Sequence, residues 1–194
     1  MDKEIEATFI KADHAAMRLV LEKVGAKQIY SERLFRRYIF APHNEEEIHG
    51  TWIRVRDEGD KVTMSVKRVS GAKIEDQSEV CLTVNSFDDG YEFLKQLGLK
   101  QKAYQETKRE LWKIGDVEIT LDTWPGISPI IEIEGPSEEL VRKAAEQLEL
   151  DYNEAVFGAV DLIYEMEAGI TQDQINNQTL EIKFEKPPKK EDYS

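Results

Sequence analysis

Alternating polar and aliphatic residues recur along the chain and predict β-strands. Two adjacent segments show the pattern most clearly: residues 117–122 read V-E-I-T-L-D, and residues 130–134 read I-I-E-I-E. Successive side chains of a strand point to opposite faces, so Glu132 and Glu134 share one face and the isoleucines share the other. By the same rule Asp122 lies on the acidic face of its own strand. The pattern therefore predicts two strands that each carry acids on a single face.

The start of the chain repeats this arrangement. Residues 3–9 read K-E-I-E-A-T-F, which places Glu4 and Glu6 together opposite apolar residues. The simplest interpretation is that such acids cover the solvated outer face of an antiparallel sheet, where alternating polar residues usually point. Alternation alone favours this interpretation at least as much as a functional one.

A basic hairpin follows in residues 51–68. The segment W-I-R-V-R places Arg54 and Arg56 on one face, a four-residue turn follows, and Lys67 lies on the returning strand. Four-residue loops commonly join antiparallel strands. A solvated face with surface ion pairs again explains these cations, and such pairs stabilise a fold only weakly.

The rest of the pattern predicts an α+β protein. The Gly115-Asp116 pair is a turn signal, so residues 110–114 should pair with residues 117–122 as a hairpin. Cap residues and apolar stripes predict helices, and a short alternation predicts an edge strand. The predicted helices are 14–24, 87–97, one capped by Ser137 and ending near 148, and 156–167, and the edge strand is 179–184.

Composition narrows the class of protein. The formal net charge of −13 argues against non-specific binding to nucleic acid or to anionic membranes. No apolar run approaches the ~20 residues of a membrane span, and the first residues lack the apolar stretch of a signal peptide. We therefore expect a soluble, cytoplasmic protein. Cys81 is the only cysteine and the three histidines are scattered, so any metal should be a hard ion bound by oxygen.

In order and spacing, these motifs resemble the CYTH superfamily, the triphosphate tunnel metalloenzymes, which include class IV adenylyl cyclases, thiamine triphosphatases and inorganic triphosphatases. The similarity runs from about residue 3 to residue 164. The resemblance rests on these motifs: E-I-E at 4–6, R-V-R at 54–56, Lys67, K-R-E-L-W at 108–112, L-D-T-W-P-G at 121–126, E-I-E-G at 132–135 and A-V-F-G-A-V-D-L-I-Y at 155–164.

The resemblance implies an eight-stranded antiparallel closed β-barrel with helices packed outside, whose polar faces line an internal tunnel. It also implies residue roles. The acids around Mg²⁺ or Mn²⁺ would be Glu4, Glu6, Asp122, Glu132 and Glu134, and the phosphate ligands would be Arg54, Arg56, Lys67 and Arg109. The tunnel domain would span residues 1–166, and residues 167–194 would form an extension, partly docked, with a disordered end.

The substrate implied is a triphosphate-containing small molecule. A metal-dependent triphosphatase is the first hypothesis, a class IV adenylyl cyclase making cyclic AMP from ATP is the second, and a non-catalytic binder of phosphorylated ligands is the third. Thr8 and Thr107 stand where many family members carry lysine, so the tunnel is less basic than usual. The resemblance leaves a homodimer open and implies no nucleic-acid or membrane partner.

Overall fold

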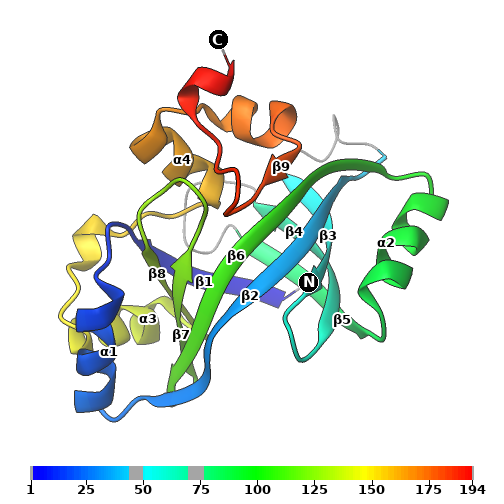
Figure 1. Ribbon diagram of the computed structural model, residues 1–194. Coiled ribbons are helices and arrows are strands. Elements are labelled where there is room, and N and C mark those ends of the chain that lie inside the picture. Colours follow the sequence, from blue (N-terminus) through cyan, green and yellow to red (C-terminus); the bar gives the residue numbers. More distant parts are fainter. Residues whose placement is uncertain (1, 44–49, 70–76, 194) are drawn as a thin grey trace.

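The computed structural model describes residues 2–43, 50–69 and 77–193. Its main feature is an antiparallel sheet of long strands (Figure 1). These strands are β1 Asp2–Phe9, β2 Lys27–Ala41, β3 Thr51–Asp57, β4 Val62–Val69, β5 Gln77–Val84, β6 Lys100–Ile114, β7 Val117–Thr123 and β8 Ile130–Gly135.

The strands pair in the order β2-β3-β4-β5-β1-β8-β7-β6, and β2 and β6 also pair with each other over most of their length. The sheet is strongly curled, with the long β2 and β6 crossing its front in Figure 1. The predicted hairpin is present, since β6 turns at Gly115, at a positive φ of 58°, and returns as β7. The antiparallel eight-stranded sheet is thus confirmed, whereas its closure into a barrel stays a prediction.

Three helices match the sequence pattern closely. They are α1 His14–Lys23, α2 Phe87–Gln96 and α3 Glu138–Gln147. Asp13, Ser86 and Ser137 accept hydrogen bonds from backbone N–H groups of the first turns, as N-cap residues do. All three helices lie outside the curl of the sheet in Figure 1.

The C-terminal elements differ from the prediction in their bounds. The fourth helix, α4, spans Val160–Ala168 rather than 156–167, because Gly158 has a φ of 145° that a helix cannot contain. The edge strand is reduced to β9, Glu181–Ile182, which pairs in parallel with β6. Short helical turns complete the chain: η2 Tyr152–Glu154, η3 Gln174–Gln178 and η4 Lys190–Tyr193.

The two faces of the sheet have opposite character. Aliphatic residues of the outer face pack under α1 and α3 in one cluster that includes Ala7, Ile119 and Ile133, all 0% exposed. A second cluster joins Val55 of β3 to Leu94 of α2. The inner face carries the polar residues, and several of them are buried. The interpretation of these faces as solvated outer surfaces was therefore wrong.

A third apolar cluster lies where α4 and the last residues meet the sheet. Trp124, directly after β7, and Ile130 of β8 pack in one cluster with Ile170, Ile175 and Ile182, which are at most 3% exposed. The phenol of Tyr164 donates to the carbonyl of Pro125 at 2.6 Å and fixes α4 there. Residues after 167 thus share a core with the sheet, while the domain boundary between 166 and 167 stays a prediction.

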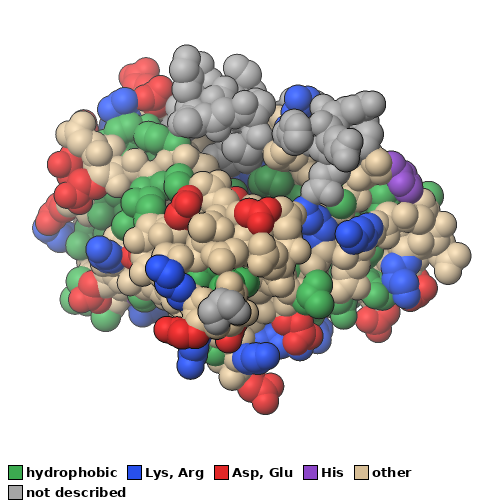
Figure 2. Space-filling view, turned by 90° about the horizontal axis from the view of Figure 1, so that it is seen from above, with side chains coloured by type: hydrophobic (Ala, Val, Ile, Leu, Met, Phe, Trp, Pro, Cys, Tyr) green, Lys and Arg blue, Asp and Glu red, His purple; other side chains and the backbone are tan. Residues whose placement is uncertain are grey.

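The face of the molecule drawn in Figure 2 shows no single sign of charge. In the face seen from above in Figure 2, acidic and basic side chains are interspersed. None of the helices in the described part of the chain combines the length and hydrophobicity needed to cross a membrane.

Candidate functional site

The strand register places polar residues of successive strands side by side on the inner face. Directly opposed residues of an antiparallel pair share a face. The opposed pairs on this face are Arg37 with Arg56, Arg54 with Ser65, Lys67 with Glu79, Glu6 with Glu134, Thr8 with Glu132, and Arg109 with Asp122.

Arg109 of β6 links the two acidic strands. Its Nε donates to both carboxylate oxygens of Asp122, at 2.7 and 3.0 Å, and a terminal nitrogen contacts Asp122 and Glu132. The hydroxyl of Thr120 donates to the same two carboxylates at 3.3 and 3.4 Å. The side chain of Asp122 is 0% exposed and that of Arg109 is 19% exposed, so this is a buried, charge-assisted cluster.

The two carboxyl groups of this cluster differ in their affinity for protons. Burial raises the pKa of Asp122 to about 7, against the opposing charge of Arg109, and the charge of Glu132 adds to the rise. Burial also disfavours ionised Glu132, but Arg109 and the hydrogen bond with Asp122 keep its pKa below its usual value. The two groups therefore titrate as a pair in which Asp122 holds its proton to the higher pH.

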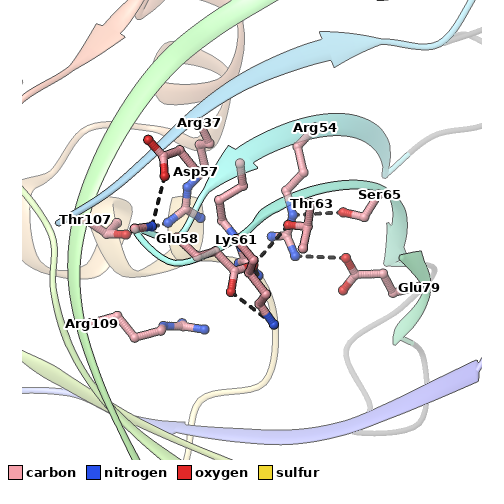
Figure 3. A network of polar contacts seen from close by, with 12 residues as sticks. Arg37, Arg54, Asp57, Glu58, Lys61, Thr63, Ser65, Glu79, Thr107 and Arg109 are labelled. Atoms are coloured by element: carbon pink, nitrogen blue, oxygen red, sulfur yellow. Dashed lines mark hydrogen bonds and ion pairs between the residues drawn. The ribbon is translucent and has the colours of Figure 1, made fainter. Parts of the chain in front are cut away.

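Arg54 of β3 lies across the face from this cluster. Its Nε donates to the hydroxyl of Ser65, and a terminal nitrogen donates to Glu79, both at 2.9 Å. The side chains of Arg54 and Glu79 are each 12% exposed. Figure 3 shows Arg54 and Arg109 extending from different strands toward one another.

Glu58 is a site residue that the sequence pattern missed. It follows β3 in the turn, yet its side chain folds back into the site and is 5% exposed. One carboxylate oxygen accepts from Arg56 at 3.0 and 2.7 Å and from the hydroxyl of Thr63 at 3.0 Å. Lys61 approaches the other oxygen at 3.4 Å. Alternation describes strands only, so it gave no signal for an acid that returns from a turn.

Arg37 of β2 is the second residue that the pattern missed. It is 6% exposed and donates to the hydroxyl of Thr107. Its guanidinium carbon lies 4.7 Å from the centre of the Trp124 ring. Burial lowers the pKa of Arg37 well below its usual value, and the charges of Arg56, Arg54 and Arg109 lower it further. The position of an arginine within the apolar residues of β2 was the available signal.

The acids of β1, β8 and β7 form a row across three strands. Glu134 lies directly opposite Glu6 on one side and Glu118 on the other. Like charges placed directly opposite each other destabilise a sheet. Burial raises the pKa of Glu134; Lys67 opposes the rise, and Glu118 increases it. Lys113 pairs with Glu118 at 2.7 Å and offsets part of the negative charge of this row.

The predicted metal ligands do not converge in this structure. Among the residues described, no group of three or more histidine, cysteine, aspartate or glutamate side chains is close enough to hold a metal ion. Two of the predicted acids, Asp122 and Glu132, instead contact Arg109. The backbone of Glu4 lies in β1, but its side chain is outside the described residues.

The predicted basic residues lie near these acids. Lys67 is close enough for its charge to lower the pKa of Glu132 and to oppose the raised pKa of Glu134. The structure thus places on one face the predicted residues Glu6, Arg54, Arg56, Lys67, Arg109, Asp122, Glu132 and Glu134. Their roles in binding or catalysis stay predictions.

Comparisons with known proteins agree on the fold. The family model of the CYTH domain matches residues 2–162. A candidate adenylate cyclase from Vibrio parahaemolyticus has 15% sequence identity and a TM-score of 0.71, and the match covers 84% of this chain and 98% of the Vibrio chain. The PH1819 protein from Pyrococcus horikoshii OT3 has 20% identity and a TM-score of 0.65, and the match covers 84% of this chain and 99% of the PH1819 chain.

A third solved structure is a candidate adenylyl cyclase from Hippeastrum, described as having a dominant triphosphatase activity. It has 13% identity and a TM-score of 0.56, and the match covers 84% of this chain and 94% of the Hippeastrum chain. At these identities the likeness shows a shared fold. No curated protein sequence matches this chain significantly.

Proposed function

This chain belongs to the CYTH domain family, and from that premise we propose that it is a metal-dependent hydrolase of a triphosphate-containing small molecule. The observation that carries the proposal is that the buried cluster of Arg109, Asp122 and Glu132 shares one face of the sheet with Arg54. Arginine binds phosphate oxygens in a bidentate manner, and carboxylates are ligands of hard divalent ions. The face therefore carries both kinds of group that a metal-bound triphosphate requires.

Substrate binding would exchange the ion pairs within the cluster. Arg109 donates to Asp122 and Glu132, and phosphate oxygens can accept the same hydrogen bonds. Once Arg109 turns to phosphate, the two carboxylates need another cation. Arg109 would then be paired with phosphate and the two carboxylates with the incoming cation, so no charged group would be left unpaired in a buried site.

The chemistry of these oxygen donors, though not their present spacing, suits a divalent ion of the hard class. Asp122, Glu132, Glu134 and Glu6, with Glu4, would hold Mg²⁺ or Mn²⁺, because carboxylate oxygens are the ligands that these ions prefer and Glu6 lies directly opposite Glu134. When bound, the ion would withdraw charge from the phosphates that it contacts. The protein's own contribution would be to place and orient the triphosphate through Arg54, Arg56, Lys67 and Arg109, since positioning and electrostatics dominate phosphoryl transfer.

An enclosed tunnel is part of the proposal. The pairing of β2 with β6 supports it, because this pairing joins the two ends of the strand order. A closed sheet would exclude water from the inner face and strengthen its charge contacts. Water attack on the terminal phosphoryl group would then complete hydrolysis. A cytoplasmic location and a homodimer remain predictions.

Non-catalytic binding of a phosphorylated ligand is the second candidate function. It is favoured by two threonines, Thr8 and Thr107, which are 3% and 1% exposed on the inner face. A lysine at either position would have added a positive charge to the site. With threonine there, charge stabilisation of the transition state would be weaker.

The decisive assay offers the purified protein inorganic tripolyphosphate, thiamine triphosphate and nucleoside triphosphates, each with Mg²⁺ and with Mn²⁺. Phosphate, pyrophosphate and cyclic nucleotide are measured as products. We expect phosphate release from at least one triphosphate and a loss of about tenfold to a thousandfold in kcat/KM in Arg54→Ala. Cyclic nucleotide as the main product would replace the hydrolase proposal with the cyclase.

Thr8→Lys separates the enzyme from the binder. The new side chain would lie directly opposite Glu132, which offers it an anionic partner. If the wild-type site has lost catalysis, Thr8→Lys should create or raise tripolyphosphate hydrolysis. Absence of turnover in the wild type, Thr8→Lys and Arg54→Ala, despite measurable binding of triphosphate and metal, would defeat the hydrolase and leave the binding protein.

A further inference from the structure

Arg37 occupies an unusual position for an arginine. It lies on the inner face of β2, directly opposite Arg56 of β3 on one side and Gln105 of β6 on the other. Its neighbour on the same strand face, Phe35, is 1% exposed, and Arg37 itself is 6% exposed. Figure 3 shows Arg37, Arg54 and Arg109 directed toward one another from three strands.

The hydrogen bonds of Arg37 leave most of its guanidinium unused. A terminal nitrogen donates to the hydroxyl of Thr107, and the group stacks at 4.7 Å over Trp124. Its Nε atom is buried and has no hydrogen-bond partner. In the part of the chain that the structure describes, no carboxylate lies within ion-pair distance of Arg37.

The three other arginines of the site differ in this respect. Arg54 pairs with Glu79, Arg56 with Glu58, and Arg109 with Asp122 and Glu132. Arg37 is thus a buried cation among other cations: the charges of Asp122 and Glu132 act on it from beyond ion-pair distance, while both carboxylates pair directly with Arg109. A buried charge without a counter-ion is strongly unfavourable. An anion that entered this space would relieve the imbalance at Arg37 first.

We infer that Arg37 is a ligand-binding residue that contacts a phosphate oxygen of the bound triphosphate, held in place for this contact by Thr107 and the ring of Trp124. The inference rests on the proposed function, because it assigns a further contact within the same site. A guanidinium has five N–H donors in a planar fork. The one that Thr107 uses leaves the buried Nε and other donors for a phosphate group.

Trp124 sets the position of the guanidinium. The indole belongs to the apolar cluster with Ile175 and Ile182, so its ring is fixed by residues of the C-terminal segment. Stacking over a fixed ring restricts Arg37 to one orientation. The entropy lost when its side chain is ordered is then spent during folding rather than during binding, which favours affinity.

The test compares Arg37→Met with Arg36→Met. Arg36 is the adjacent residue with the opposite orientation; it is 47% exposed and pairs with Asp57. Inorganic tripolyphosphate is titrated into each protein by calorimetry, in EDTA and again with Mg²⁺. We expect Arg37→Met to weaken binding about tenfold to a hundredfold, as for loss of a hydrogen bond to a charged group, and Arg36→Met to change it by less than about twofold.

The melting temperature of the ligand-free protein distinguishes binding from a structural role. Because Arg37→Met removes an unpaired buried charge, ligand-free Arg37→Met should melt at or above the wild-type temperature. Arg37→Lys keeps the positive charge but lacks the planar guanidinium, so it should bind tripolyphosphate with intermediate affinity. If Arg37→Met does not fold, the affinity of Arg37→Lys tests the inference in its place. Weaker binding accompanied by a lower melting temperature in both Arg37 variants would overturn the inference.

The outcomes also separate this inference from the proposed function. Wild-type protein that binds tripolyphosphate, together with an Arg37→Met variant that binds it equally well, refutes the role of Arg37 and leaves the proposed function standing. Wild-type protein that binds no tripolyphosphate in either condition removes both.

Discussion

Replacing Asp122 by asparagine should change how stability depends on pH. The carboxyl group is fully buried, and its pKa is raised from 3.8 to about 7 by burial, with Arg109 opposing and Glu132 adding to the rise. Between these two pH values the folded protein binds a proton that the unfolded chain releases. The wild type therefore loses stability as pH rises through this window, and Asp122→Asn removes this dependence because the amide does not titrate.

The size of this loss of stability follows from the size of the pKa shift of Asp122. One pKa unit corresponds to about 1.4 kcal/mol, so the full window removes about 4 kcal/mol from the free energy of unfolding. Between pH 5 and pH 7 the loss is about 2–3 kcal/mol. Glu132 does not cancel it, because its pKa is lowered and it titrates below this range. The Asp122→Asn substitution would still leave Arg109 paired with Glu132.

Urea unfolding at pH 5, 6 and 7 in EDTA, followed by fluorescence of the three tryptophans, measures the difference. Asp122→Asn should gain about 2–3 kcal/mol relative to the wild type as pH rises from 5 to 7. Glu149→Gln is the control, because Glu149 is 69% exposed, and its curve should follow the wild type. Parallel curves for the wild type and Asp122→Asn would refute the assignment of a buried proton to this carboxyl group.

Two further predictions test the acidic row and the packing of α2. Changing both Glu132 and Glu134 to glutamine should abolish Mn²⁺ binding in calorimetry; unchanged affinity would reject the metal assignment. Gly90→Ala should lose about 1–3 kcal/mol in urea unfolding, since the added Cβ would lie 2.8 Å from a methyl group of Val55. Stability equal to or above that of the wild type would show that α2 moves freely on the sheet.

Strand alternation predicted the orientation of the site residues correctly. Glu132 and Glu134 share a face because side chains alternate along any strand, and this rule does not depend on the partner strands. The same rule placed Arg54 and Arg56 together. What alternation left open was whether this face points outward or inward, since that depends on where the helices pack. The resemblance to a family supplied the answer.

The contacts within the site were beyond sequence reasoning. The sequence suggested Arg109 as a phosphate ligand and Asp122 as a metal ligand, but these two side chains pair with each other. Opposite charges in one buried space pair wherever the register brings them together, and register is a tertiary property. Glu58 was missed because its side chain returns from a turn, and Arg37 because its burial depends on β6 and Trp124.

The position of β1 in the strand order affects how the protein folds. β1 begins at residue 2 but pairs with β5, residues 77–84, and with β8, residues 130–135. During synthesis its second edge stays unpaired until more than half of the chain has been made. Contacts between such distant segments form slowly, and an unpaired edge invites aggregation. Charged residues on an edge strand oppose pairing between chains, and β1 carries the acids Glu4 and Glu6.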